Sequence, residues 1–184
     1  MTRLWAVVLC AAHPWMAFAQ SVPEPAGYRH DQYRGPVPET LAGAAVISDE
    51  EAHALWQSGA AVFVDVLPRA PKPENLPEGT VWRQKPRHSI PGAIWMPNVG
   101  YGKLAAAYES YYRSGLTQVT GGRPDQPVVI FCLAECWMSW NAAKRAVSWG
   151  YTAVSWYPEG TDGWAFMGFD TESLVPMPGE PRAN

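Results

Sequence analysis

The chain has 184 residues, 47% of them hydrophobic, and a formal net charge of −3 at neutral pH. This length suits one domain with a single hydrophobic core and is short for two. The acidic balance argues against nucleic acid or an anionic membrane surface as a partner.

The first segment has the pattern of a leader for export. Arg3 precedes an apolar run over residues 4–12, and Ala-Phe-Ala at residues 17–19 fits a small-residue cleavage signal. The apolar run is too short to span a bilayer, which disfavours a retained anchor. We therefore expect residues 1–19 to be a signal peptide and the mature protein to lie in a bacterial periplasm, with no membrane span.

Residues 20–45 are expected to form an extended arm. They hold four prolines, scattered charge and no apolar period. Tyr28 and Tyr33 are the side chains that we expect to attach this arm to the domain.

A helix and a buried strand should follow the arm. Ser48 and Glu51 form a capping box that begins the helix, and Gly59 ends it. Residues 61–67 are almost wholly apolar, as in a central parallel strand. Asp65, near the end of this strand, lies where ligands bind in such sheets, although its carboxylate could equally hold neighbouring backbone N–H groups.

The connection over residues 68–89 is rich in proline and positive charge. Its cations are Arg69, Lys72, Arg83, Lys85 and Arg87. A connection of this length without secondary structure is unusual in a compact domain and often functional. It forms either a semi-rigid flap that lends positive charge to a site or partner, or a solvated insertion.

The second half of the chain alternates strands and helices. A Pro91-Gly92 turn leads into a short strand, and residues 101–113 have helical spacing, with Gly115 beyond the helix. Further elements are expected as strands at residues 128–132 and 153–157, a helix ending at Gly150, a turn and short helix from residue 158, and a tail over residues 169–184. This alternation predicts an α/β class with a mainly parallel sheet.

The chemistry is expected in the loop after the strand at residues 128–132. Cys132 and Cys136 are spaced Cys-x-x-x-Cys-Trp, and the remaining cysteine, Cys10, lies in the predicted leader. Backbone N–H groups and the helix dipole point into such a strand-to-helix turn and acidify a thiol there. A disulfide between the two would close too short a loop to stabilise much. We favour a reactive pair over an inert local disulfide or half of a metal site.

Two other features of the sequence leave alternatives open. A metal site would need two more ligands, and the histidines after the leader are His30, His53 and His88. No metal is predicted. Trp137 and Trp140 flank the loop, either as a flat aromatic wall for a quinone or a cytochrome, or as core residues.

Four landmarks together resemble the rhodanese-like fold, a three-layer α/β fold, over about residues 46–168. They are Val62-Phe63-Val64-Asp65-Val66, His88-Ser89-Ile90-Pro91-Gly92-Ala93, the strand at 128–132 with its helix, and Glu159-Gly160-x-Asp162-Gly163-Trp164. The resemblance implies that Cys132 is the counterpart of the family's catalytic cysteine. It also implies that His88 makes a structural hydrogen bond to the loop.

The Cys-x-x-x-Cys-Trp motif and the proline-rich arm are more narrowly similar to the family of pyrroloquinoline quinone (PQQ)-dependent catabolism-associated CXXCW motif proteins. This resemblance implies a periplasmic protein linked to PQQ-dependent alcohol oxidation. The partner would be a PQQ-dependent alcohol dehydrogenase or its cytochrome c. PQQ or another redox cofactor stays open.

The loop departs from the common rhodanese pattern in its charge. Leu133 stands where such loops carry an arginine, Trp137 and Met138 precede Ser139, and Glu135 adds a negative charge. The longer spacing to Ser139 resembles the related cell-cycle phosphatases, which need a loop arginine to hold a phosphoryl dianion. The missing arginine argues against phosphatase activity.

Three functions follow, in order of preference. The first is thiol redox or persulfide chemistry at Cys132 and Cys136, in which the second thiol resolves an intermediate formed on the first. The second is a non-enzymatic binding or assembly module for a quinoprotein dehydrogenase, its cytochrome or its cofactor, and the third is thiosulfate sulfurtransferase activity. The supporting site residues are predicted to be Leu133, Ala134, Glu135, Trp137, Met138, Ser139, Asp65 and His88.

Overall fold

A computed structural model describes residues 22–70 and 72–181 of the chain. The predicted signal peptide lies outside these residues. Within them, no helix combines the length and apolar character needed to cross a membrane.

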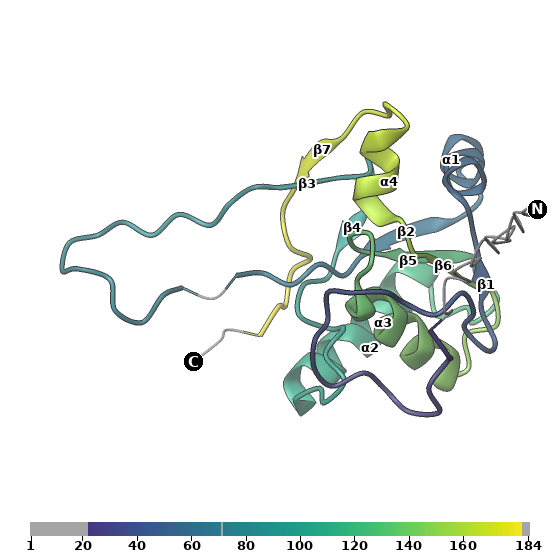
Figure 1. The fold of residues 1–184 in the computed structure, drawn as a ribbon, viewed down its shortest axis with the longest axis horizontal. Coiled ribbons are helices and arrows are strands. Elements are labelled where there is room, and N and C mark those ends of the chain that lie inside the picture. Colours follow the sequence, from purple (N-terminus) through teal and green to yellow (C-terminus); the bar gives the residue numbers. More distant parts are fainter. Residues whose placement is uncertain (1–21, 71, 182–184) are drawn as a thin grey trace, which may run out of the picture.

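A five-stranded parallel sheet forms the centre of the molecule (Figure 1). The described residues form seven strands in all, five in this sheet and two outside it. They are β1 (Ala45–Val46), β2 (Val62–Asp65), β3 (Arg87–Ser89), β4 (Ile94–Trp95), β5 (Val128–Phe131), β6 (Val154–Tyr157) and β7 (Glu172–Leu174). The main sheet has the order β1-β6-β5-β2-β4, and every pair in it is parallel. Strands β3 and β7 form a separate antiparallel pair. The predicted α/β class with a mainly parallel sheet is confirmed.

Four helices cover the two faces of this sheet. They are α1 (Asp49–Ser58), α2 (Ala106–Thr120), α3 (Trp137–Ser148) and α4 (Gly160–Phe166). Helices α2 and α3 lie on one face and α1 and α4 on the other (Figure 1). Each face has its own apolar core, one built around Trp140 and Trp156 and the other around Phe131 and Trp164. The result is three layers, with the sheet buried on both sides.

Helix α1 begins and ends as predicted. The Ser48 side chain accepts from the Glu51 backbone N–H, and the Glu51 carboxylate accepts from the Ser48 N–H at 2.9 Å. Gly59 ends the helix at φ 62°, a left-handed conformation that costs glycine little.

Helix α2 differs from the prediction, because it starts at Ala106 and continues to Thr120. Gly115 was expected beyond the helix and lies inside it. A Cβ at Gly115 would come within 2.7 Å of the Met96 sulfur, so the glycine allows the helix to pack closely on the core. Close packing outweighs the weak helix propensity of one glycine here.

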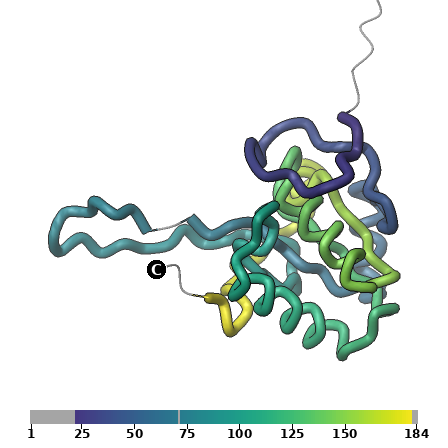
Figure 2. The backbone as a smooth tube through the Cα atoms, turned by 90° about the horizontal axis from the view of Figure 1, so that it is seen from below, coloured from purple at the N-terminus to yellow at the C-terminus, as the bar shows by residue number. Residues whose placement is uncertain are grey.

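The arm winds over the outer side of α3 (Figure 2). The buried Asn141 side chain holds it by accepting from the Arg29 backbone N–H at 2.9 Å and donating to the Arg29 carbonyl at 2.8 Å. Tyr28 lies 3.5 Å from the Ser148 hydroxyl, and the Tyr33 hydroxyl accepts from the Gly102 N–H at 3.2 Å. Both tyrosines therefore contact the domain.

The connection over residues 68–70 and 72–86 projects away from the domain as a long flap (Figures 1 and 2). It exposes Val81 by 77% and Trp82 by 37%. At its root, Arg69 pairs with Glu180 of the tail at 3.1 Å.

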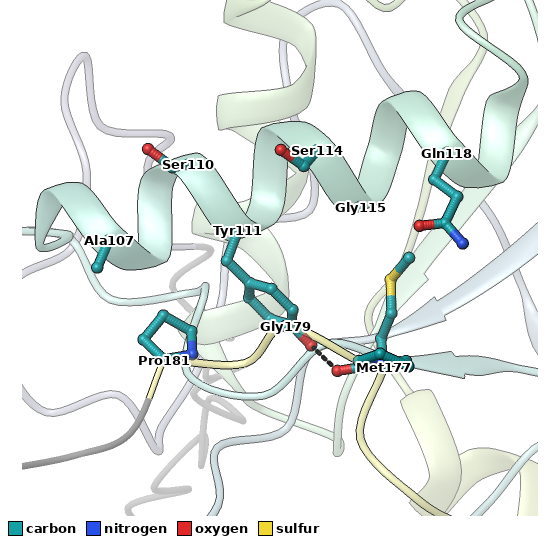
Figure 3. Close-up of a pocket in the computed structure, with 10 residues that line it drawn as sticks. Ala107, Ser110, Tyr111, Ser114, Gly115, Gln118, Met177, Gly179 and Pro181 are labelled. Carbon is teal, nitrogen blue, oxygen red and sulfur yellow. Dashed lines mark hydrogen bonds between the residues drawn. The ribbon is translucent and has the colours of Figure 1, made fainter.

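The tail packs on α2 and lines with it an open pocket of about 510 Å³ (Figure 3). The Tyr111 hydroxyl donates to the Met177 carbonyl at 3.0 Å, and the Met177 N–H donates to the Trp95 carbonyl at 2.8 Å. The pocket is lined by α2 and tail residues and includes neither cysteine.

Candidate active site

The cysteine loop leaves the sheet at the carboxyl end of β5. Cys132 follows Phe131, which pairs in register with Asp65 at the end of neighbouring β2. Glu135 has φ 49°, and this left-handed turn brings the chain to Cys136, the N-cap of α3. The parallel register therefore brings Asp65 beside the loop, where ligands of such sheets bind.

The Cys132 carbonyl is the anchor of the loop. It accepts from the Thr161 N–H at 3.0 Å, the Thr161 hydroxyl at 3.2 Å and the Arg87 guanidinium at 3.3 Å. Gly160 packs so closely that a Cβ there would be 2.5 Å from the Cys132 oxygen. The first turn of α4 thus holds the first cysteine through its backbone.

Asp65 supports the loop from below through Arg87. Its carboxylate accepts from the Arg87 Nε and from the Ser89 hydroxyl, both at 2.6 Å, and from the Leu67 N–H at 2.8 Å. Burial raises the pKa of Asp65, and the Arg87 charge and these hydrogen bonds oppose that rise. Of the two roles left open for Asp65, the structure shows the supporting one.

The two thiols are free and both are buried, Cys132 with 0% and Cys136 with 3% of its surface exposed. The Cys132 sulfur lies 3.7 Å from the carbonyls of Leu133 and Cys136, which suit a protonated thiol. Burial raises the pKa of Cys132 well above its ordinary value, and its hydrogen bond to Cys136 adds to this.

Cys136 is the acidic thiol of the pair. Its pKa is lowered to about 7, first by the hydrogen bond from the Cys132 thiol and then by the Met138 and Leu133 amides and the Arg34 charge, while burial acts against them. Cys136 makes no side-chain hydrogen bond to the first turn of α3. The sequence predicted the thiolate at Cys132, and this stays a prediction. The lowered pKa makes Cys136 a second candidate for the nucleophile.

The arm closes over the cysteine loop. Arg34 pairs with Cys136 in an antiparallel bridge, flanked by hydrogen bonds from the Gly35 N–H to the Glu135 carbonyl and from the Trp137 N–H to the Tyr33 carbonyl, both 2.9 Å. Sequence reasoning treated the arm as an attachment. Its contact with the site had no signal in the sequence, because the residues that meet are about 100 positions apart.

The aromatic wall proposed for Trp137 and Trp140 is absent from the surface. The two side chains are 4% and 0% exposed, and their indole N–H groups donate to the arm carbonyls of Pro36 and Thr40 at 3.0 and 3.1 Å. The alternative that Trp137 and Trp140 are core residues is therefore correct. The arm covers the face that would have met a quinone or a cytochrome.

The remaining loop residues have supporting positions. Ser139 donates to the Cys136 carbonyl at 3.0 Å and accepts from the Trp156 indole at 3.1 Å, and Met138 is buried in the core. The Ala134 N–H donates to Asp162 at 3.2 Å. Leu133 is half-buried beside Ala134, and Glu135 is exposed.

His88 does not make the hydrogen bond to the loop that the resemblance implied. On β3 the side chains of Arg87 and Ser89 point inward, so the residue between them is exposed. Among the described residues, no hydrogen bond of the His88 side chain is present. His53 stacks on Phe169 at a ring distance of 3.9 Å.

One cation of the predicted connection over residues 68–89 reaches the site, and it is Arg87, on β3 at the base of the flap. Arg87 is buried under the loop, whereas Lys72, Arg83 and Lys85 are exposed on the projecting part. Among these four cations, the predicted contribution of positive charge to the site therefore holds only for Arg87. Its signal was the alternation with Ser89, which places both residues on one face of a short strand.

Within residues 22–70 and 72–181, no three potential ligands gather as a metal site would require. Charge around the loop comes from single side chains instead. The acids are Glu135, Glu159 and Asp162, and the cations are Arg34 above the loop and Arg87 beneath it.

The similar solved structures include sulfurtransferases. A thiosulfate sulfurtransferase from Pseudomonas aeruginosa is 18% identical, with 72% of this chain and 21% of that chain covered and a TM-score of 0.48. A polysulfide-sulfur transferase from Wolinella succinogenes is 19% identical (71% and 80% covered, TM-score 0.45), and a human single-domain sulfurtransferase is 23% identical (68% and 96% covered, TM-score 0.41). No family model and no curated protein matches the chain.

The chain thus spans about a fifth of the first of these structures. Its own layers and strand order are consistent with the rhodanese-like fold that the four sequence landmarks resemble. The loop itself holds two free, buried thiols four positions apart.

Proposed function

We propose that the chain handles sulfane sulfur through its two thiols, with Cys136 as the attacking group and Cys132 as the resolving one. The observation that carries this proposal is the contact between two free thiols in one loop, where the Cys132 sulfur lies 3.7 Å from the Cys136 carbonyl. The lowered pKa of Cys136 supports the assignment of the two roles. A thiolate is the nucleophile in sulfur exchange, and a thiol with a pKa near the ambient pH attacks best.

The proposed reaction has two steps. The Cys136 thiolate attacks the outer sulfur of a donor such as thiosulfate, the donor S–S bond breaks, sulfite leaves, and a Cys136 persulfide forms. Cys132 then loses its proton and attacks the Cys136 sulfur, which forms a disulfide and releases hydrosulfide with that proton. An external dithiol restores the pair by thiol exchange.

The burial of both sulfurs sets a condition for this chemistry. A donor reaches Cys136 only after the loop or the covering arm moves, because 3% of that side chain is exposed. Two backbone hydrogen bonds join the arm to the loop at this point. Their opening is a local event of the kind that weakly held surface segments undergo.

Peptide mass analysis tests the assignment of roles. After reduction and treatment with thiosulfate or polysulfide, a Cys132→Ser chain should gain one sulfur atom on Cys136, and a Cys136→Ser chain should gain none. The wild type should proceed to the disulfide and lose two hydrogens. Persulfide formed on Cys132 of the Cys136→Ser chain at the wild-type rate would contradict the proposal.

The setting that we propose is a bacterial periplasm, in support of PQQ-dependent alcohol oxidation. The leader pattern at residues 1–19 and the Cys-x-x-x-Cys-Trp motif support it. A strain that lacks the chain should grow poorly on an alcohol oxidised through PQQ, and the wild-type gene should restore growth. Full rescue by the Cys136→Ser gene would show that the role in alcohol oxidation does not require the thiol chemistry.

A binding or assembly role is the second candidate. The flap favours it, since it projects from the domain (Figure 1) and exposes Val81 by 77% and Trp82 by 37%. Co-purification from the periplasm tests this role. Retention of a quinoprotein dehydrogenase or its cytochrome by the double Cys132→Ser, Cys136→Ser chain, with loss on Trp82→Ala, would support it.

A further inference from the structure

We propose that Arg34 of the arm is the cation of the cysteine site and selects anionic sulfur donors, an inference that rests on the proposed sulfur handling. The loop itself contains no arginine or lysine between Cys132 and Ser139. The arm brings one to the same place from about 100 residues away.

The pairing geometry turns Arg34 toward Cys136. The two hydrogen bonds of the bridge join the neighbours of the pair, Gly35 with Glu135 and Trp137 with Tyr33. Arg34 and Cys136 are therefore a non-hydrogen-bonded antiparallel pair, the type in which facing residues lie closest, about 4.5 Å between Cα atoms. Side chains of directly opposite residues emerge on the same face of such a pair.

The position of Arg34 suits an arriving ligand. Cys136 is buried beneath the arm, whereas the Arg34 side chain is exposed at its edge. In the described part of the chain, Arg34 makes no ion pair, while its arm neighbour Arg29 pairs with Asp31 at 3.4 Å. Its charge still reaches the Cys136 sulfur and lowers the pKa of that thiol.

Other charges near the loop cannot take this role. Arg87 is buried and paired with Asp65, so its charge is already balanced. Glu135 and Asp162 are exposed acids beside the loop, and both would repel an anion.

The chemistry of sulfane sulfur makes such a cation useful. Thiosulfate, polysulfides and deprotonated persulfides are anions, and each must approach a thiolate in the proposed reaction. A guanidinium at the mouth of the site reduces this repulsion and binds oxyanions through paired N–H donors. Neutral donors gain nothing from it, so the arginine favours anionic donors over neutral ones.

Two alkylating reagents test the inference, because iodoacetate is an anion and iodoacetamide is neutral. In the Cys132→Ser chain, the alkylation of Cys136 is followed by peptide mass for each reagent. Arg34→Gln should lower the rate with iodoacetate about two- to fivefold more than the rate with iodoacetamide, the range expected for an exposed ion pair. Arg34→Lys should keep most of the preference. Arg123→Gln, which removes an exposed arginine outside the loop and the arm, is the control and should change neither rate.

Salt gives a second readout. The relative rate of iodoacetate should fall with ionic strength in the parent chain and stay level in Arg34→Gln. Equal effects of Arg34→Gln on the two reagents, or no effect on either, would overturn the inference and leave the sulfur chemistry standing. A Cys136 that reacts with neither reagent in the folded wild-type chain would overturn both.

Discussion

The arm and the flap are two irregular, proline-rich segments, and they behave in opposite ways. The arm, residues 22–44, lies on α3 and closes over the cysteine loop, whereas the flap, residues 68–70 and 72–86, projects into solvent (Figures 1 and 2). Both segments are rich in proline, so proline content does not decide the difference. The decisive factor is whether the domain presents partners for the backbone of the segment.

Helix α3 presents such partners to the arm. Buried donors and an acceptor of Asn141, Trp137 and Trp140 meet backbone groups of the arm. An irregular segment has no regular backbone hydrogen bonds of its own, so its N–H and C=O groups need side chains or water as hydrogen-bond partners. In the flap, the Gln84 amide donates to the Ala70 carbonyl at 3.0 Å, which joins the two sides of the flap near its root.

The largest effect should come from the root of the flap. Arg87→Met leaves the Asp65 carboxylate buried without its cation, and we expect a loss of about 3–5 kcal/mol in the free energy of unfolding. Urea denaturation measures it. Arg83→Met on the projecting part is the matched control, and an equal loss there would mean that the flap packs as the arm does.

Removal of the hydrogen bonds between Asn141 and the arm should have the next largest effect. Asn141→Ala removes two hydrogen bonds to Arg29 and one to the Gly100 carbonyl, at a cost of about 2–4 kcal/mol. Because the arm is then held less firmly, alkylation of Cys136 in the folded chain should also become faster. Gln118→Ala on the exposed side of α2 serves as the control. An unchanged alkylation rate in a destabilised Asn141→Ala chain would show that the arm does not limit access.

The midpoint pH of Cys136 alkylation should be set by the groups around its sulfur and not by the charges of the flap. With its pKa lowered to about 7, Cys136 becomes a thiolate as the pH rises through neutrality, so its alkylation rate should rise there and level off above pH 8. Cys132→Ala removes the main donor and should move the midpoint to higher pH. Replacing Lys72, Arg83 and Lys85 together by glutamine should leave it unchanged. A midpoint that follows the flap charges would contradict the separation of the two regions.

The smallest effect should come from shortening the flap. Replacing residues 73–84 by a short Gly-Ser linker removes no fully buried side chain, and we expect a change in unfolding free energy below about 1 kcal/mol. Urea denaturation again measures it. A large loss, with the Arg69–Glu180 pair at the root left intact, would show that the flap contributes to the core.

Local sequence patterns predicted most of the sheet and one helix in detail. The capping box at Ser48 and Glu51 is complete in the structure, and the apolar runs became the adjacent strands β2, β5 and β6. These signals act over a few residues, so the sequence displays them directly. The limits of α2 could not be predicted in the same way, because the close approach of Gly115 to Met96 exists only in the folded chain.

The position of the cysteine loop was predictable, and the roles within it were not. The Cys-x-x-x-Cys-Trp motif after a buried strand is enough to place two thiols at the carboxyl edge of a parallel sheet. Which thiol is acidic depends on burial and on the donors around each sulfur, and these come from the fold.

The chain's pattern of apolar runs, caps and paired cysteines determines an α/β domain with a thiol loop at the edge of its sheet. Only the tertiary structure places Arg87 under the loop and Arg34 over it, and buries Trp137 and Trp140 beneath the arm. The physical reason is range. Hydrophobic period and capping act between near neighbours, whereas charge, burial and backbone pairing act between residues that meet only when the chain is folded.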